Sequence, residues 1–208
     1  AHVLEAAEED IEFTDGNLTV SGTDKSLHIC DMVPMSYMPM GWPAHLGIGL
    51  EAEATWTPET GPNWPNGTHF SEVEVDPDTG AVKLLRLTTA HDVGRILNPL
   101  DHQGQIDGAI IQGVGYALSE DLQLEEGRVG TVTFGDYKIP CIQDIPKLDT
   151  VILDSDSGPG PYNARGIGEN PCGCVAPAIA NAVADASGAR IHHLPITAEK
   201  VFHELKSR

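Results

Sequence analysis

A single carboxylate, Glu169, ends a glycine-rich stretch that reads Arg165-Gly-Ile-Gly-Glu169. Glycines lack a Cβ atom, so this main chain can lie close against a bound group. A buried or half-buried carboxylate held beside such a group is a candidate general base. Arg165 is the nearby cation, and the residues alone leave open whether it binds a phosphate or pairs with an acidic neighbour.

Other familiar catalytic patterns are missing from the sequence. It has no H-E-x-x-H spacing, and the adjacent His192 and His193 would point to opposite sides of a strand. It has no G-x-S-x-G nucleophile elbow and no P-loop lysine. Cys172 and Cys174 form only a lone C-x-C, which is a weak metal signal. We therefore predict no metal site built from protein ligands, and a metal-independent hydrolase is a distant alternative.

Composition excludes some partners. The 208 residues carry a formal net charge of -19, which disfavours binding to nucleic acid or to an anionic membrane. No apolar run is long enough to cross a membrane, and the acidic start does not resemble a signal peptide. The chain begins without Met, so we expect a processed piece, a subunit or a fragment of a longer protein. We predict a cytoplasmic location, with the periplasm left open.

Two helices are expected to position the candidate residues. The first follows Glu169: Pro177 suits a first helical position, Ile179 and Val183 share one face, and Gly188 supplies the stop. The second covers residues 105–118 and begins at Gln105, which either hydrogen-bonds a polar ligand or faces water. Its three glycines disfavour a helix, so they indicate close packing against a ligand or simply against another helix.

The remaining pattern predicts an α+β fold of mixed strands and packed helices. Residues 70–75 and 82–90 flank a strong turn sequence and predict a β-hairpin. A Pro-, Met- and Trp-rich stretch, residues 34–67, is either a linker or a long ordered loop. We divide the chain into an N-terminal α/β segment, residues 1–66, and a C-terminal unit, residues 67–208. Further expected elements are the end of a helix at 3–11, strands at 18–20, 50–56, 129–134 and 148–153, and a helix at 198–205.

Taken together, these motifs resemble one family. The chain is similar to the end of the molybdenum-binding large subunit of the xanthine dehydrogenase, aldehyde oxidase and carbon monoxide dehydrogenase family, the molybdenum hydroxylases. The motifs follow the family's order along nearly the whole chain, and together they are highly specific. They are Val73-Glu-Val-Asp-Pro-Asp-Thr-Gly80, Asp92-Val-Gly-Arg-Ile-Leu-Asn-Pro99, Gly104-Gln-Ile-Asp-Gly108, Gln112-Gly-Val-Gly-Tyr-Ala-Leu118, Asp136-Tyr137, the Glu169 stretch, Ala176-Pro-Ala-Ile-Ala-Asn-Ala-Val and Leu194-Pro-Ile-Thr197.

The resemblance implies a site and a reaction. It implies a C-terminal cofactor-binding domain in which Glu169 is the active-site base beside molybdenum. The cofactor is a molybdenum-pyranopterin in its cytosine dinucleotide form, shared with a partner chain. The family's reaction oxidises a carbon centre of an aldehyde, a purine or another N-heterocycle and takes its oxygen from water. The residues that the resemblance assigns to cofactor binding are Gly104, Gln105, Arg165, Gly166, Ile167 and Gly168.

The resemblance also implies partners. Family members often have Lys where this chain has Arg165, and a different residue where it has Asn170. The upstream part of the molybdenum subunit, the [2Fe-2S] cysteines and any FAD region are absent from these residues. We therefore expect a larger molybdenum-binding chain, a [2Fe-2S] subunit and an FAD subunit as partners, with a small-molecule substrate. The alternative is a noncatalytic scaffold or fragment of the same fold that binds no cofactor.

Overall fold

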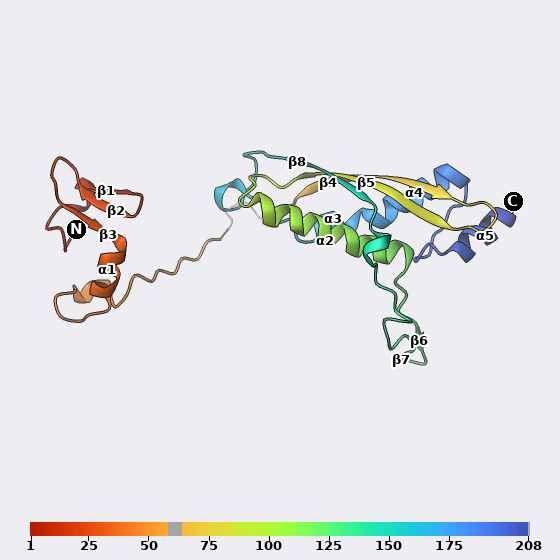
Figure 1. Cartoon of the computed structure of the whole chain (residues 1–208), viewed down its shortest axis with the longest axis horizontal. Coiled ribbons are helices and arrows are strands. Elements are labelled where there is room, and N and C mark those ends of the chain that lie inside the picture. The colour runs from red at the N-terminus through yellow and green to blue at the C-terminus, as the bar shows by residue number, and fades with distance from the viewer. Residues whose placement is uncertain (58–63, 208) are drawn as a thin grey trace. The chain divides into compact units, whose positions relative to one another are not determined.

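The chain folds into two compact units, Ala1–Trp56 and Thr57–Arg208 (Figure 1). The computed structural model describes residues 1–57 and 64–207. The predicted N-terminal segment ends at residue 66, so its residues 58–63 lie outside the described part. Among the described helices, none has the length and apolarity needed to span a membrane.

The N-terminal unit is built on a small antiparallel sheet of three strands. The tight turn before the second strand uses Asp15 and Gly16, both with positive φ, as the Asp-Gly-Asn sequence predicts. The strand predicted at residues 18–20 is confirmed. The elements of this unit are η1 (Glu8–Asp10), β1 (Ile11–Thr14), β2 (Asn17–Val20), β3 (Ser26–His28), α1 (Ile29–Ser36) and η2 (Ala44–Leu46).

Two predicted elements of this unit are wrong. Residues 3–11 do not end a helix, because Glu5 adopts a positive φ of 51° and only the single turn of η1 follows. Residues 50–56 form no strand. Their alternation of Ala and Thr with charged residues resembles an edge strand, but no neighbouring strand pairs with them in the described structure.

The C-terminal unit contains a three-stranded mixed sheet in the order β4-β5-β8. Strands β4 (Asn66–Val75) and β5 (Val82–Asp92) form the predicted hairpin, and Gly80 closes its turn with a positive φ. Strand β8 (Lys147–Leu153), predicted at 148–153, pairs with β5 in parallel. The central strand β5 therefore ends beside the end of β8, and loops that leave this edge lie close together.

A β-bulge changes which side chains of β5 face the core. Glu72 pairs with Arg86 and Val73 pairs with Leu84, so Leu85 is an extra residue in β5. Before the bulge an even-numbered residue, Leu84, is buried, whereas after it the buried residues are odd-numbered and include His91. The bulge thus directs the His91 side chain inward.

Helices cover one face of this sheet and enclose the core (Figure 1). Helix α4 packs on β4, and α2 packs against both α3 and α4. Ile106, Ile110 and Val114 are buried along α2, at the spacing predicted for a helix in this region. The helices are α2 (Pro99–Leu118), α3 (Asn170–Gly173), α4 (Val175–Ser187) and α5 (Ala198–Lys206).

Helix α2 begins six residues before its predicted start. Asn98 caps it by accepting hydrogen bonds from the backbone N–H groups of Leu100 and Asp101, and Pro99 occupies the first position. Helix α4 begins at Val175, two residues before Pro177, and ends at Gly188 in the left-handed conformation as predicted. The predicted terminal helix is confirmed as α5.

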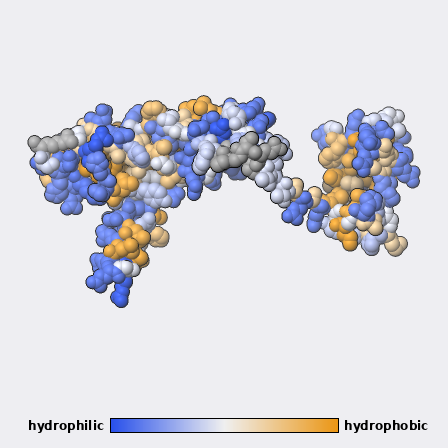
Figure 2. Space-filling model, turned by 180° about the vertical axis from the view of Figure 1, so that it is seen from behind, coloured by the Kyte–Doolittle hydropathy of each residue, from blue (hydrophilic) through white to orange (hydrophobic). Residues whose placement is uncertain are grey.

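An arm leaves the C-terminal unit between α2 and β8 (Figure 1). The predicted strand 129–134 is wrong, because β7 (Arg128–Val129) pairs only with the equally short β6 (Leu124–Glu125) and the rest is irregular. The 3-10 helix η3 (Ile142–Asp144) follows. Hydrophobic side chains on the arm, including those of Val132 and Phe134, lie at the surface (Figure 2).

Candidate functional site

Glu169 lies at the surface, immediately before α3. It occupies the N-cap position of that helix, and its side chain makes no capping hydrogen bond. The residue is exposed, so within this chain it lacks the burial that would make such a carboxylate a candidate base on the sequence pattern alone. The described residues of this chain alone therefore do not keep water away from Glu169.

The loop that precedes Glu169 has unused main-chain groups. Within the described residues, the backbone of Gly166, Ile167 and Gly168 forms no hydrogen bond. Neither glycine has a positive φ, and a Cβ added to either would meet nothing within 4 Å. This chain's own folding therefore does not require glycine at these two positions, and three consecutive N–H groups are left to bind oxygen or nitrogen acceptors.

Ile167 anchors the middle of this loop. Its side chain is half-buried and packs against the hydrophobic core, while the flanking Gly166 and Gly168 are exposed. The loop is thus anchored to the core by one apolar side chain. Any contact of Ile167 with a group bound on the outer surface would use its main chain.

Arg165 anchors the start of the loop and answers the question left open by the sequence. Its side chain is only 13% exposed, and its guanidinium lies 3.4 Å from a carboxylate oxygen of Asp92. The same group donates hydrogen bonds to the backbone oxygen of Trp64 and to both oxygens of Ser157. Arg165 therefore pairs with an acidic neighbour and uses its charge inside the chain.

The carboxylate of Asp92 is held in its charged form. Its pKa is lowered by a hydrogen bond from the Gly94 backbone N–H, and further by the Ser155 hydroxyl and by Arg165. Backbone hydrogen bonds join the same two segments, from Arg165 N–H to the Val93 oxygen at 2.7 Å and from Arg95 N–H to Asn163 at 3.1 Å. The loop after β5 therefore fixes the segment that leads to Glu169.

The second group of predicted residues lies on the exposed side of α2. Gly104, Gln105 and Gly108 are exposed there, and a Cβ added to either glycine would meet nothing within 4 Å. Gly113 differs, because its Cβ would lie 2.6 Å from the Val175 side chain. Helix α2 packs against α3, so the two groups of predicted residues lie on adjoining elements.

A cluster of three histidines lies beneath the start of α3. His91 and His102 are buried, and His69 contacts His91 edge-on with ring centroids 5.3 Å apart. Nδ1 of His91 lies 2.7 Å from Oδ1 of Asn170, the first residue of α3. The sequence places His91 at the mouth of the following loop but gives no sign of its contact with Asn170, since 79 residues separate them.

The histidine cluster predicts acid sensitivity. Burial, and then the neighbouring His91, lower the pKa of His69 from 6.5 to about 4. The native state therefore binds fewer protons than the unfolded state between these values. The contribution of His69 to the free energy of unfolding should be fully present above pH 6.5. It should be lost as the pH drops to 4, which lowers the free energy of unfolding by about 1–3 kcal/mol for this partly buried group. Urea unfolding at several pH values measures this free energy, and His69→Asn should make its pH dependence shallower. An equally steep fall in that variant would contradict the assignment of the pH dependence to His69.

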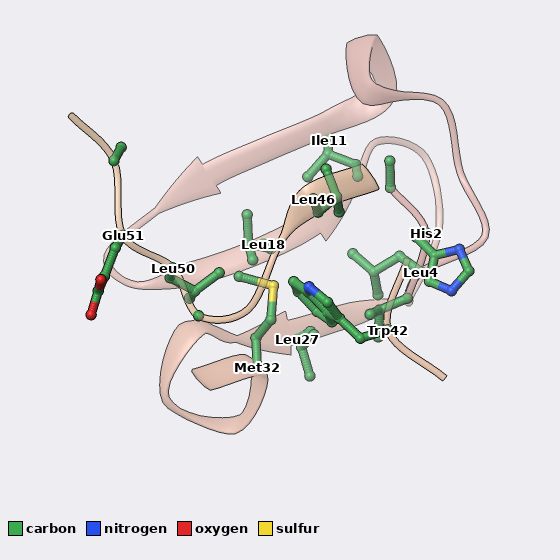
Figure 3. A pocket seen from close by; sticks show the side chains of 14 residues that line it. His2, Leu4, Ile11, Leu18, Leu27, Met32, Trp42, Leu46, Leu50 and Glu51 are labelled. Carbon is green, nitrogen blue, oxygen red and sulfur yellow. The ribbon is translucent and has the colours of Figure 1, made fainter. Parts of the chain in front are cut away.

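The N-terminal unit has an apolar pocket of a different character (Figure 3). Its volume is about 390 Å³, and Leu18, Leu27, Met32 and Trp42 contribute to its lining. Aliphatic, thioether and indole groups bury surface but carry no acid–base function at neutral pH. We assign no chemistry to this pocket.

A protein-ligated metal centre is not found in the part of the chain that the structure describes. There, no three His, Cys, Asp or Glu side chains are grouped so that they could hold a metal ion. All four cysteines are free, and Cys174 is exposed. Burial raises the pKa of the Cys172 thiol, which keeps this thiol protonated at neutral pH.

Comparisons with known proteins identify the family. The family described as the molybdopterin cofactor-binding domain matches residues 1–146. The chain therefore belongs to that family, and it corresponds to a portion of the large subunits of molybdenum hydroxylases. The match ends before Arg165 and Glu169, whereas the comparisons with individual proteins extend over nearly the whole chain.

Individual relatives are oxidoreductase subunits. The gamma subunit of the 6-hydroxypseudooxynicotine dehydrogenase complex of Paenarthrobacter nicotinovorans is 35% identical over 97% of this chain and 26% of its own length. The nicotine 6-hydroxylase large subunit of the same organism is also 35% identical, over 99% and 26%. The chain thus spans about a quarter of the length of these relatives.

Solved structures agree with the fold class. Quinoline 2-oxidoreductase from Pseudomonas putida 86 matches with a TM-score of 0.81 and 33% identity, over 100% of this chain and 27% of that one. A Cu,Mo-CO dehydrogenase matches with a TM-score of 0.80 and 28% identity, over 99% and 26%. The predicted α+β fold of mixed strands and packed helices is confirmed.

Proposed function

We propose that this chain forms one wall of the molybdenum-pyranopterin site of a molybdenum hydroxylase and supplies Glu169 as the base. The observation that carries the proposal is the open loop before Glu169. Gly166 and Gly168 serve no need of the chain's own packing or backbone, and three main-chain N–H groups there have no acceptor in the described structure. A flat ligand rich in oxygen and nitrogen acceptors fits such a surface.

Each predicted residue has a role in this proposal. Gly166, Ile167 and Gly168 offer main-chain N–H groups to the cofactor, while the Arg165 side chain holds their loop in place. Gly104 allows close approach to α2, and Gln105 offers an amide. When bound, the cofactor supplies the redox chemistry. The chain's own contribution is to orient it and to remove a proton at the Glu169 carboxylate.

The proposed reaction oxidises a carbon centre of an aldehyde, a purine or another N-heterocycle, with water as the oxygen source. Relatives named for nicotine and quinoline support a heterocyclic substrate. We further propose the cytosine dinucleotide form of the cofactor, separate [2Fe-2S] and FAD subunits, and a cytoplasmic location. A larger molybdenum-binding chain would cover Glu169, which is exposed in this chain.

The same reasoning extends to the N-terminal unit. We propose that residues 1–66 complete a domain shared with an upstream segment or a partner chain. The apolar pocket beside the three-stranded sheet supports this, because such a surface is stabilised when further apolar side chains cover it. In this arrangement the N-terminal unit contributes packing and no catalytic residue.

Cofactor content separates this function from a noncatalytic scaffold. Molybdenum and pterin are measured in the native assembly purified with its partner chains. We expect both to be present at one cofactor per copy of this chain. The exposure of Glu169 in this chain is compatible with both readings, and absence of molybdenum and pterin from the native assembly would establish the scaffold alternative.

Gly104→Leu should change cofactor content and stability in opposite directions. Leucine favours a helix over glycine by about 0.5–1 kcal/mol, and Gly104 has open space around it, so the variant should be at least as stable as the wild type. Its molybdenum content should nevertheless fall, because the side chain occupies the surface proposed for the cofactor. Metal analysis and thermal unfolding measure the two effects.

Gly113→Ala is the matched control on the same helix. Its new methyl group would lie 2.6 Å from Cβ of Val175, so this variant should lose stability. If the Gly104→Leu protein keeps its full molybdenum content, Gly104 is not part of the cofactor site.

A further inference from the structure

The contact between His91 and Asn170 joins the sheet to the residue that follows Glu169. Asn170 Oδ1 accepts a hydrogen bond from His91 at 2.7 Å. The amide nitrogen of Asn170 donates to the backbone oxygen of Pro65 at 3.4 Å. Because a carbonyl oxygen only accepts, the Pro65 contact orients the amide and requires His91 to carry its proton on Nδ1.

The surroundings of His91 favour this single arrangement. The side chain is fully buried on β5, and its Nε2 atom has no hydrogen-bond partner among the described residues. Two further imidazoles face it, His69 from β4 and His102 from α2. A positive charge would be costly in this buried cluster, so the neutral form of His91 is stabilised, and the hydrogen bond to Asn170 places its proton on Nδ1.

Gly67 leaves room for the hydrogen bond. It pairs with His91 across the hairpin. A Cβ added to Gly67 would lie 2.8 Å from His91 Nδ1 and 2.8 Å from Asn170 Oδ1. Its φ is not positive, so close packing against this hydrogen bond, rather than backbone conformation, is what requires glycine there.

We propose that His91 is a positioning residue for Glu169, acting through Asn170 in a way that Gly67 makes sterically possible. Asn170 is one peptide unit from Glu169, and the Glu169 backbone oxygen accepts from the Cys172 N–H at 3.1 Å. The hydrogen bond to His91 therefore holds the first turn of α3, and with it the carboxylate. Its catalytic consequence rests on the proposed function, whereas its structural consequence does not.

The test uses the full chain in its native assembly and begins with hydrogen exchange. In His91→Leu and Gly67→Ala, exchange at the Cys172 amide should become up to about tenfold faster, as expected for the loss of one buried hydrogen bond. The Arg165 amide, bonded to Val93, should keep its protection. His91→Asn places an amide donor near the position of Nδ1 and should restore slow exchange. His102→Leu removes a second buried imidazole, one that forms no hydrogen bond with Asn170 in the described structure, and should leave exchange at the Cys172 amide unchanged.

Turnover supplies the second measurement, with benzaldehyde, hypoxanthine and quinoline as probes and a dye as electron acceptor. His91→Leu should lower kcat roughly 10- to 100-fold with little change in KM and no loss of molybdenum, because a displaced base costs rate rather than binding. Unchanged exchange at Cys172, or equally faster exchange at Arg165, would overturn the positioning role. Local loosening in His91→Leu combined with a fully active Glu169→Gln would instead overturn the base assignment and leave the structural link intact.

Discussion

Glu169→Gln should abolish turnover of the native assembly while leaving its cofactor in place. General acid–base catalysis contributes roughly 10²- to 10⁴-fold, so kcat should fall by at least that range for every probe substrate that the wild type oxidises. Glutamine has nearly the same shape as glutamate but cannot take up a proton. Since Glu169 is exposed and makes no capping hydrogen bond, the substitution removes no internal contact that the fold requires.

Three measurements on the purified assembly make this result decisive. Molybdenum and pterin content, thermal unfolding and kcat are compared between Glu169→Gln and Glu74→Gln. Glu74 is an exposed glutamate on β4 of the same unit, so this control removes an equal charge away from the site. Both variants should be as stable as the wild type and should contain molybdenum. Turnover retained in Glu169→Gln would refute the role of Glu169 as the base.

Local pattern explains which elements of this fold are predictable. The hairpin of β4 and β5 has alternating strands around an Asp-Pro-Asp-Thr-Gly turn, and α4 has an apolar face and a glycine stop. In each case neighbouring residues carry the whole signal. The strand predicted at 129–134 has similar β-forming residues, but only Val129 of it belongs to β7, where it pairs with Leu124, and the rest of the stretch has no strand partner in the described structure. Strand formation there depends on a partner that the sequence does not reveal.

The candidate site likewise has a part that the sequence predicts and a part that it does not. Its residues follow from the resemblance to a family, because a short glycine loop that ends in Glu169 is a weak signal by itself. The contacts that hold the loop join residues far apart in sequence, such as Arg165 with Asp92, which are 73 residues apart. The parallel pairing of β5 with β8 brings the segments that follow these strands together, and no local pattern predicts that pairing.

The anchoring of the loop is also where a single methyl group should do the most damage. Gly94→Ala should destabilise the C-terminal unit by about 2–4 kcal/mol. Gly94 has a φ of +68°, which an L-residue rarely adopts, and its added Cβ would collide with the backbone oxygen of Asn163. That oxygen also accepts from the Arg95 N–H, so the collision must displace the segment that Arg165 continues.

Gly127→Ala separates the two costs. Gly127 has a φ of +81° but nothing within 4 Å of its added Cβ, so this variant pays only for the left-handed backbone, about 1–2 kcal/mol. The difference between the two free energies of unfolding in urea therefore measures the collision at Asn163. Gly94→Ala should also lose molybdenum, because the displaced segment leads directly to Gly166 and Gly168. Equal destabilisation and full molybdenum content in both variants would show that the loop after β5 does not hold the cofactor loop in place.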